Sequence, residues 1–173
     1  MGDSLITITA IVLAAILMFV FPLMAMSDRT DDVVQLAVAT ATTDFVNDVR
    51  TTGKLKLDDY SKFVETINST GNAYEVEMEI KSLDENPGKK ATQVQSKKIG
   101  ENVYYSTYTT QILETLDNKK SISLKEGDMI SVKVKNTNVT LSQQLKNFFY
   151  TVTGNDTYTI AAEHGGLVTA NGG

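Results

Sequence analysis

The 173-residue chain contains no cysteine, no tryptophan and only one histidine. Without cysteine, neither a disulfide framework nor a thiolate metal site can form. His164 lies in a Glu-His-Gly-Gly sequence typical of a turn, and the chain offers no second histidine for a metal site or a triad. We therefore expect His164 to be a surface residue. A serine-nucleophile elbow, a phosphate-binding loop and a zinc-protease motif are also absent. The sequence thus predicts no enzyme, no cofactor, no metal site and no small-molecule substrate.

Basic residues are also scarce. The chain has 16 lysines and arginines against 21 aspartates and glutamates, which gives a net charge of −5. Nucleic-acid-binding domains have a basic patch, so this balance argues against nucleic acid as a partner. Asp28, Asp31 and Asp32 follow the apolar start of the chain, but their spacing is not that of a calcium-binding loop. The share of apolar residues, 42%, is ordinary for a folded domain.

Residues 5–26 form a long stretch without a charged side chain. About 20 apolar residues allow an α-helix to cross the ~30 Å hydrocarbon core of a bilayer, where only a helix or a closed barrel satisfies the backbone. A cleavable secretory signal is the alternative, but it has a basic first segment and a shorter apolar core. Residues 1–4 contain no lysine or arginine. We expect residues 5–26 to remain as a transmembrane helix behind a short N-terminus, residues 1–4.

The sequence after this segment has little positive charge. Arg29 is the one basic residue before Arg50, whereas cytoplasmic flanks are rich in lysine and arginine, so the rest of the chain is predicted to lie outside the cytoplasm. Residues 27–52 contain no glycine or proline and should continue the helix. Its apolar stripe has helical spacing: Val34, Val38, Ala41, Phe45 and Val49. Pro22 predicts a bend near the outer interface, and Gly53 predicts the helix stop.

Residues 53–173 are predicted to form an extracytoplasmic head. Its expected elements are an extended segment 54–57, a helix 59–67 capped by Asp58, a strand 73–83, a polar loop 84–98, a helix 103–116, a turn 125–128, a strand 129–135, a helix 141–150 capped by Thr140 and a strand 157–163, with a bulge or break at Gly165 and Gly166. Strand 73–83 alternates apolar and charged residues, so the sheet has one exposed face.

The other face of such a sheet needs helices to cover it. We expect residues 27–52 to do so together with helices 59–67 and 141–150. The predicted core includes Phe45, Phe63, Met78, Val132 and Ile160. The fold class is therefore α+β: a long transmembrane and amphipathic helix that carries a small head of antiparallel sheet and helices.

This layout resembles the type IV pilin-like proteins, and most closely the single-anchor envelope proteins of Tad-type pili (TadE-like minor pilins). Residues 53–83 are similar to the Tad minor-pilin arrangement of a glycine stop, an acidic and aromatic helix start and an alternating strand. The resemblance implies membrane insertion, followed by assembly into a helical homopolymer whose centre is a bundle of N-terminal helices. The implied partners are the chain itself or other pilin-like envelope proteins. Pilins carry a basic leader and a glutamate after it; here Gly2 has no basic leader and Ile6 is apolar, so we expect assembly without the usual processing.

Assembly is assigned to seven residues: Asp3, Ala10, Ala14, Ala15, Pro22, Val34 and Val38. The alanines allow two helices to approach closely. A carboxylate at the edge of an apolar run is costly to bury unless it is paired. One hypothesis is that Asp3 pairs with the Met1 amine of a neighbouring copy. The alternative is that Asp3 lies in the cytoplasmic headgroup layer and stops the helix from sliding.

Two other functions remain open at this point. A membrane-anchored adaptor would bind one envelope partner through its head and never polymerise. A tethered sensor would need a cytoplasmic output, for which residues 1–4 leave no room. Three sequons, at Asn68, Asn138 and Asn155, match the N-glycosylation acceptor pattern, although chance is the preferred explanation in a chain rich in threonine and asparagine.

Overall fold

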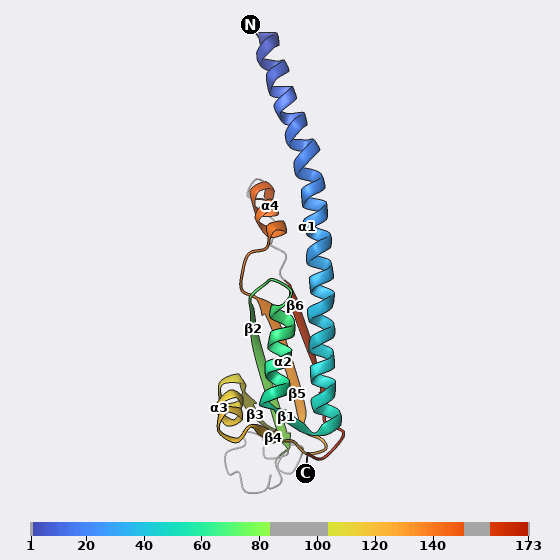
Figure 1. Ribbon diagram of the computed structural model, residues 1–173, viewed down its shortest axis with the longest axis vertical. Helices are drawn as coiled ribbons and strands as arrows, with labels where there is room; N and C mark the ends of the chain where they lie inside the picture. Colours follow the sequence, from blue (N-terminus) through green and yellow to red (C-terminus); the bar gives the residue numbers. More distant parts are fainter. Residues whose placement is uncertain (1, 84–103, 151–159, 173) are drawn as a thin grey trace, which may run out of the picture.

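The computed structural model describes residues 2–83, 104–150 and 160–172. The elements are α1 (Gly2–Thr52), β1 (Lys54–Lys56), α2 (Leu57–Asn68), β2 (Tyr74–Leu83), β3 (Tyr104–Tyr108), α3 (Thr109–Lys119), β4 (Ser121–Ser123), β5 (Met129–Asn136), α4 (Leu141–Tyr150) and β6 (Ala161–Leu167). Figure 1 shows a rod, α1, whose first half stands clear of the other elements and whose second half packs on a small sheet. The predicted α+β class, a long helix that carries a small head of antiparallel sheet and helices, is confirmed.

Helix α1 is one continuous helix of 51 residues, about 75 Å long. It passes through Pro22 without interruption and ends where the sequence predicts, at Gly53. Gly53 has a φ of 65°, a left-handed conformation that favours glycine. A Cβ atom at this position would lie 2.3 Å from the carbonyl oxygen of Ala170. Glycine is therefore required both by the backbone conformation and by the close approach of the C-terminal tail.

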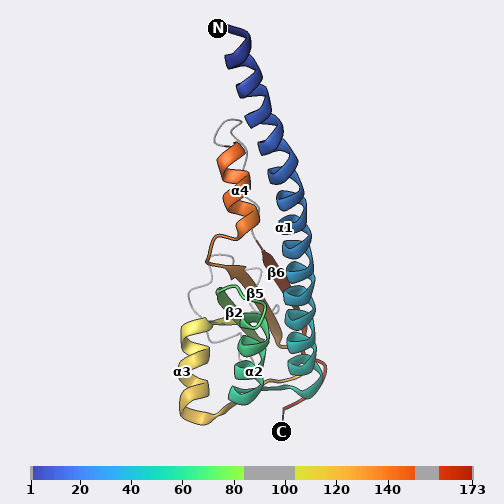
Figure 2. The same ribbon diagram turned by 45° about the horizontal axis from the view of Figure 1, so that its top comes forward.

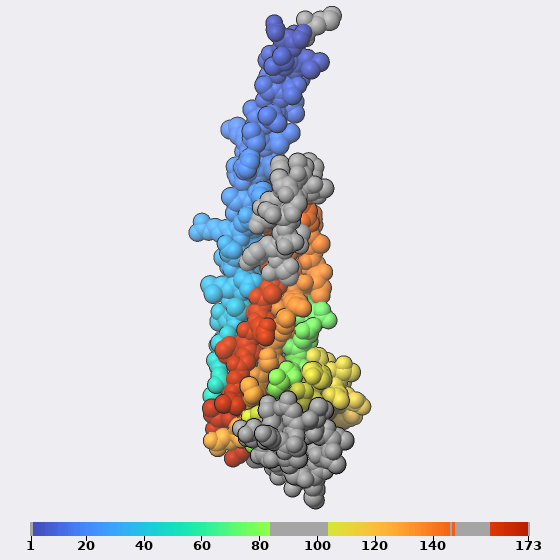
Figure 3. Space-filling model, turned by 180° about the vertical axis from the view of Figure 1, so that it is seen from behind, coloured from blue at the N-terminus to red at the C-terminus, as the bar shows by residue number. Residues whose placement is uncertain are grey.

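The main sheet has four antiparallel strands in the order β3-β2-β5-β6. β2 and β5 pair so that Met78 lies opposite Val132, and both side chains are buried. Helix α1 packs on β6 and β5 on this buried face, and α2 lies beside α1 (Figure 1). From behind, in Figure 3, β6, β5 and β2 form an open surface without a covering helix. The five predicted core residues are all buried.

Helix α2 follows the predicted pattern closely. Phe63 and Ile67 are buried, and Phe63 stacks on Phe45 of α1 with ring centroids 4.6 Å apart. Tyr60 lies at the rim of this pair, and partial burial raises the pKa of its hydroxyl group above the ordinary value of 10.0. The predicted cap is wrong, because Lys56 occupies the N-cap position and Asp58 lies in the first turn. There Asp58 still interacts favourably with the helix dipole.

The segment predicted as one helix, 103–116, contains a strand and the start of a helix. β3 pairs with the edge of β2, and α3 begins at Thr109. The prediction relied on helical spacing that included Tyr105 and Tyr108, but both tyrosines are exposed. Only Ile112 and Leu116 of that stripe are buried, and both belong to α3. The aromatic and β-branched residues of 104–108 are those that favour strands.

The C-terminal strand β6 and the β1–β4 pair also differ from the elements predicted from the sequence. The short strand β4, which pairs with β1, was not predicted. The expected break at Gly165 and Gly166 is wrong, because both pair in register with β5, opposite Ser131 and Ile130. A Cβ atom at position 165 would lie 2.9 Å from the backbone oxygen of Ile130, so the close approach of β5 favours glycine there. Residues 157–159 and the predicted loop 84–98 lie outside the described residues.

Helix α4 has the predicted bounds but a different place. Thr140 caps it: the Thr140 hydroxyl accepts a hydrogen bond from the backbone N–H of Gln143 (3.2 Å), and the Gln143 amide oxygen accepts one from the N–H of Thr140 (2.9 Å). Figures 1 and 2 show α4 beyond the end of the sheet, beside the middle of α1. The expectation that α4 covers the sheet is therefore wrong, since α1, α2 and α3 already enclose the core.

Candidate assembly surface

The first half of α1 exposes a continuous apolar surface. Its large exposed side chains are Leu5, Ile6, Ile8, Ile11, Val12, Leu13, Ile16, Leu17, Met18, Phe19, Phe21, Leu23 and Met26. Water-soluble monomers rarely expose an apolar area of this size. Among the described residues, α1 is the one helix long and apolar enough to cross a membrane. The segment 2–26 is called the free segment below.

Five of the predicted assembly residues lie on the free segment. Ala10, Ala14, Ala15 and Pro22 are exposed there, and Ala10 and Ala14 share one helix face because they are four residues apart. Asp3 is exposed in the first turn, where its negative charge suits the helix N-terminus. Its proposed partner, the Met1 amine, lies outside the described residues. The structure thus leaves these five side chains accessible to lipid or to a neighbouring copy.

The two remaining assignments are corrected by the structure. Val38 is fully buried, and Val34 packs against the core of the head. Both belong to the stripe of α1 that faces the sheet, so Val38 is closed to a second copy while the head is folded and Val34 is only partly exposed. The stripe was predicted to cover the sheet and also to take part in assembly, and only the cover of the sheet agrees with its burial.

The opposite face of α1 carries apolar residues that the sequence analysis missed. Val33 and Leu36 are 63% and 69% exposed, as much as Met26, which is also 69% exposed. Met26, Val33 and Leu36 are separated by seven and three residues, so they lie along one face of the helix. These three residues, called the outer stripe, extend the apolar surface of the free segment past the level at which the head begins. The helical spacing of Met26, Val33 and Leu36 in the sequence could have identified this second apolar face.

The acidic residues after the free segment hold α4 in place. The Asp31 carboxylate is buried and accepts a hydrogen bond from the Thr140 hydroxyl at 2.7 Å. The Ser142 hydroxyl donates to the carboxylate of Asp28. Both carboxylates therefore lie at the N-terminus of α4, where the helix dipole favours negative charge. Within the described part of the chain, no group of three or more histidine, cysteine or acidic side chains is placed to hold a metal ion.

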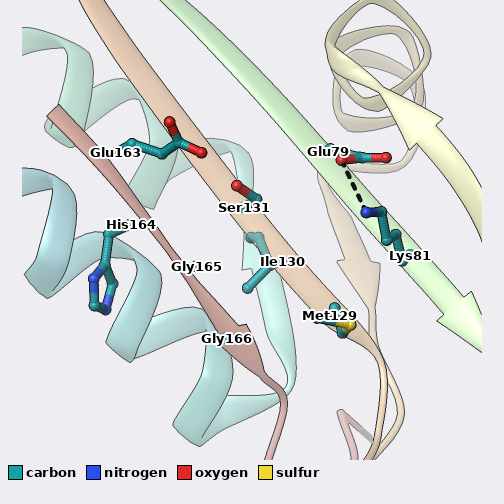
Figure 4. Close-up of a pocket in the computed structure, with 9 residues that line it drawn as sticks. All are labelled: Glu79, Lys81, Met129, Ile130, Ser131, Glu163, His164, Gly165 and Gly166. Carbon is teal, nitrogen blue, oxygen red and sulfur yellow. Dashed lines mark ion pairs between the residues drawn. The ribbon is translucent and has the colours of Figure 1, made fainter. Parts of the chain in front are cut away.

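His164 was predicted to be a surface residue, but it is only partly exposed. It pairs in register with the buried Val132, and Figure 4 shows its ring directed toward the helix that covers the sheet. Its Nε2 atom is buried without a hydrogen-bond partner among the described residues. The prediction failed because the Gly-Gly sequence suggested a turn, whereas these residues continue β6.

The open face of the sheet has a shallow hollow of about 450 Å³ in front of β5 and β6 (Figure 4). Its charged residues are Glu79, Lys81 and Glu163, and the Lys81 ammonium lies 3.5 Å from the Glu79 carboxylate. Glu163 is 4.0 Å from Lys133 on the neighbouring strand. These are cross-strand and same-strand ion pairs of an exposed face, and the His164 ring is on the other side of the sheet.

The sequons have different surroundings. Asn68 is exposed at the end of α2. The Asn138 side chain is used structurally, because its oxygen accepts from the N–H of Ala73 (2.9 Å) and its nitrogen donates to the Asn72 side chain (2.8 Å). Asn155 lies outside the described residues. Of the two described sequons, Asn68 is therefore the accessible one.

No protein-family model matches the chain, and neither a curated protein nor a solved structure is significantly similar to it. Functional inference therefore depends on the exposed surface of α1 and on the contacts of the head.

Proposed function

We propose that the chain is a pilin-like structural subunit of a cell-surface filament or of a pilus or secretion assembly, which polymerises through α1. The head would lie outside the cytoplasm, and the free segment would hold the subunit in the membrane before assembly. The outer stripe carries this proposal. A membrane anchor explains why residues 5–26 are apolar, but it does not explain exposed Val33 and Leu36.

The position of the outer stripe relative to a bilayer supports packing between α1 helices. About 20 residues span the hydrocarbon core, so residues 5–26 are sufficient. Val33 and Leu36 lie about 10 and 15 Å farther along the helix. Burying one such side chain contributes roughly 1.5–3 kcal/mol. Packing of several α1 helices would bury the outer stripe together with the free segment, which a bilayer alone does not do.

In this proposal, α1 helices pack side by side in a helical homopolymer or with other pilin-like envelope proteins. Ala10, Ala14 and Ala15 allow the free segments to approach closely. Asp3 pairs with the Met1 amine of a neighbouring copy. If Asp3 lies in the cytoplasmic headgroup layer instead, replacing it by asparagine should leave the filament yield normal.

The alternative is a membrane-anchored adaptor that does not polymerise. The same outer stripe would then pack against one helix of one partner and give a complex of fixed size. The described open face of the sheet favours the filament, because it presents paired charges instead of a large apolar patch for a partner.

The test is assembly of the purified full-length protein after detergent removal, followed by negative-stain imaging. Leu36→Gln should raise the critical concentration for filament formation about tenfold or more, because a lost burial of ~1.5–3 kcal/mol corresponds to at least that factor. The control is Leu83→Gln, which changes an exposed leucine at the end of β2. Filaments of equal yield from both variants would refute a role of the outer stripe. Particles of fixed size from the unaltered chain would support the adaptor.

A further inference from the structure

The side of α1 that carries the outer stripe also carries separated charges. Arg29 is exposed four residues before Val33. Asp44 and Asp48 are exposed eight and twelve residues after Leu36. These intervals place the charged groups on the same side of the helix as the outer stripe. Among the described residues, none of the three charged groups takes part in an ion pair, so all three are open to another molecule.

The two aspartates border a hollow of about 340 Å³ between α1 and α2, called the acidic hollow below. Three carboxylates and one ammonium group surround it: Asp44, Asp48, Asp59 and Lys62. The stacked rings of Phe45 and Phe63 also contribute to its lining. An arginine side chain suits such a place, because its aliphatic part packs on apolar groups while its guanidinium group binds carboxylates. The acidic hollow is therefore complementary to an exposed arginine.

Arg29 is too far away to reach the acidic hollow of its own chain. It lies 15 residues before Asp44 and 19 before Asp48, which corresponds to about 22 and 28 Å along the helix. At about 100° per residue, the same intervals turn Arg29 roughly 60–100° away from the aspartates around the helix axis. The positive and negative groups thus belong to two different patches. A contact between different patches of identical subunits is heterologous, and it continues into a helical polymer if its rotation does not close a ring.

We propose that Arg29 of one copy enters the acidic hollow of the next copy and thereby sets the axial displacement between these neighbours at about 22–28 Å. The partner is a second copy of this chain, so the inference rests on the proposed function, polymerisation through α1, and specifies its geometry. The same displacement brings residues 14–21 of one copy level with Val33 and Leu36 of the other, and all eight residues of that range are apolar. One displacement therefore pairs the charges and also covers the outer stripe.

Other displacements through this side of α1 are less favourable. Copies at the same height would place Arg29 beside a second Arg29, and like charges repel. A displacement of three residues, about 4.5 Å, would place Arg29 beside Asp32. Asp32 is exposed, but it already lies three positions from Arg29 on the same helix, where it offsets that charge within each copy. The pairing of Asp3 with a neighbouring Met1 amine needs copies at nearly the same height and belongs to another pair of neighbours in the polymer.

Charge reversal in two separate full-length chains tests this contact. One chain carries Arg29→Asp, and the other carries Asp44→Arg together with Asp48→Arg. Each alone should raise the critical concentration for filament formation about tenfold or more, because like charges then meet at every junction. An equal mixture should assemble at close to the unaltered concentration, since alternation of the two chains restores opposite charges at every junction. Negative-stain imaging after detergent removal counts the filaments, and mass spectrometry of the sedimented filaments gives the share of each chain.

The matched control chain carries Asp32→Arg and Asp117→Arg, two exposed aspartates outside the contact, so its net charge changes by the same amount. It should assemble alone but leave most of the Arg29→Asp chain out of the filaments. Equal incorporation with this control would show that net charge or Asp32 decides, and would overturn the inference. Normal assembly of the Arg29→Asp chain alone would also overturn it and leave the proposed function standing. Absence of filaments from the unaltered chain would refute the proposed function, and the contact with it.

Introduced cysteines measure the displacement without changing a charge, because the chain has no cysteine of its own. Leu36→Cys with Thr51→Cys joins positions 15 residues apart, the same interval as from Arg29 to Asp44. Oxidised filaments of this variant should give a ladder of disulfide-linked oligomers on a non-reducing gel. Leu36→Cys alone is the control, because it links only copies at nearly the same height. Dimers from the control and no ladder from the pair would overturn the inference independently of the charge variants.

Discussion

Replacing Gly53, at the end of α1, tests whether the C-terminal tail packs against this end of the helix. Replacing Gly53 by alanine places a Cβ atom 2.3 Å from the Ala170 carbonyl oxygen and 2.4 Å from the Gly172 nitrogen. Both neighbours are backbone atoms, so the C-terminal tail must move. That movement disturbs the hydrogen bonds from the Gly172 N–H to the Leu124 oxygen and from the Thr169 N–H to the Arg50 oxygen, each 2.9 Å long.

The expected cost has two parts. A left-handed conformation costs a non-glycine residue about 1–2 kcal/mol, and two lost backbone hydrogen bonds contribute about 1 kcal/mol each. Gly53→Ala should therefore lower the free energy of unfolding by about 3–4 kcal/mol. Gly71→Ala is the matched control, because Gly71 has a φ of 88° and nothing within 4 Å of the added Cβ. It should lose only the conformational part, about 1–2 kcal/mol.

The measurement is urea unfolding of the full-length protein in detergent, followed by the near-ultraviolet dichroism of its tyrosines. This signal reports on the head, whereas far-ultraviolet dichroism is dominated by α1. Gly127→Ala, at a φ of 93° in open space, provides a second control. If Gly53→Ala costs no more than the two controls, the tail does not close against the end of α1 and the reasoning fails.

Three further predictions concern the core, the N-terminus and the free segment. Phe63→Ala removes the buried ring stacked on Phe45 and should cost about 3–5 kcal/mol of unfolding free energy; a loss below about 1 kcal/mol would contradict its core position. Asp3→Asn should leave membrane insertion and head folding unchanged but sharply reduce filament yield if Asp3 pairs with the Met1 amine, and normal yield would end that hypothesis. A head fragment that begins at Thr30 should be a soluble, folded monomer by size-exclusion chromatography, because it lacks the free segment; aggregation with intact secondary structure would show that association does not need the free segment.

The sequence correctly predicted the elements whose apolar residues follow a single clear pattern, either helical or alternating. The bounds of α1, α2 and β5 follow from uninterrupted helical or alternating patterns and from glycine stops. Periodicity failed at residues 104–108, where two exposed tyrosines happened to match a helical spacing. Such a pattern cannot tell whether a side chain faces the core or solvent, because that depends on the edge of β2 that β3 joins.

The candidate site was only partly predictable for the same reason. Exposure of the alanines on the free segment follows from the long apolar run. Assignment of Val34 and Val38 to assembly failed because the face of α1 that packs on β6 was given a second role, while the exposed stripe on the other face was overlooked. The environment of His164 was equally hidden, since its partner Val132 is more than thirty positions away along the chain and is brought close only by strand pairing.

The way α1 contributes to the core has a consequence for how the protein is made. α1 packs most closely on β6, and one of these contacts joins the Gln35 side chain to the backbone of Ala161, 126 positions later. During synthesis, the sheet-facing stripe of α1 is therefore complete long before the strand that covers it. Contacts of such long range form slowly, and apolar surface that is exposed in the meantime invites aggregation. With the free segment in the membrane, as proposed above, each nascent chain would be tethered and its uncovered stripe would be kept apart from those of other copies.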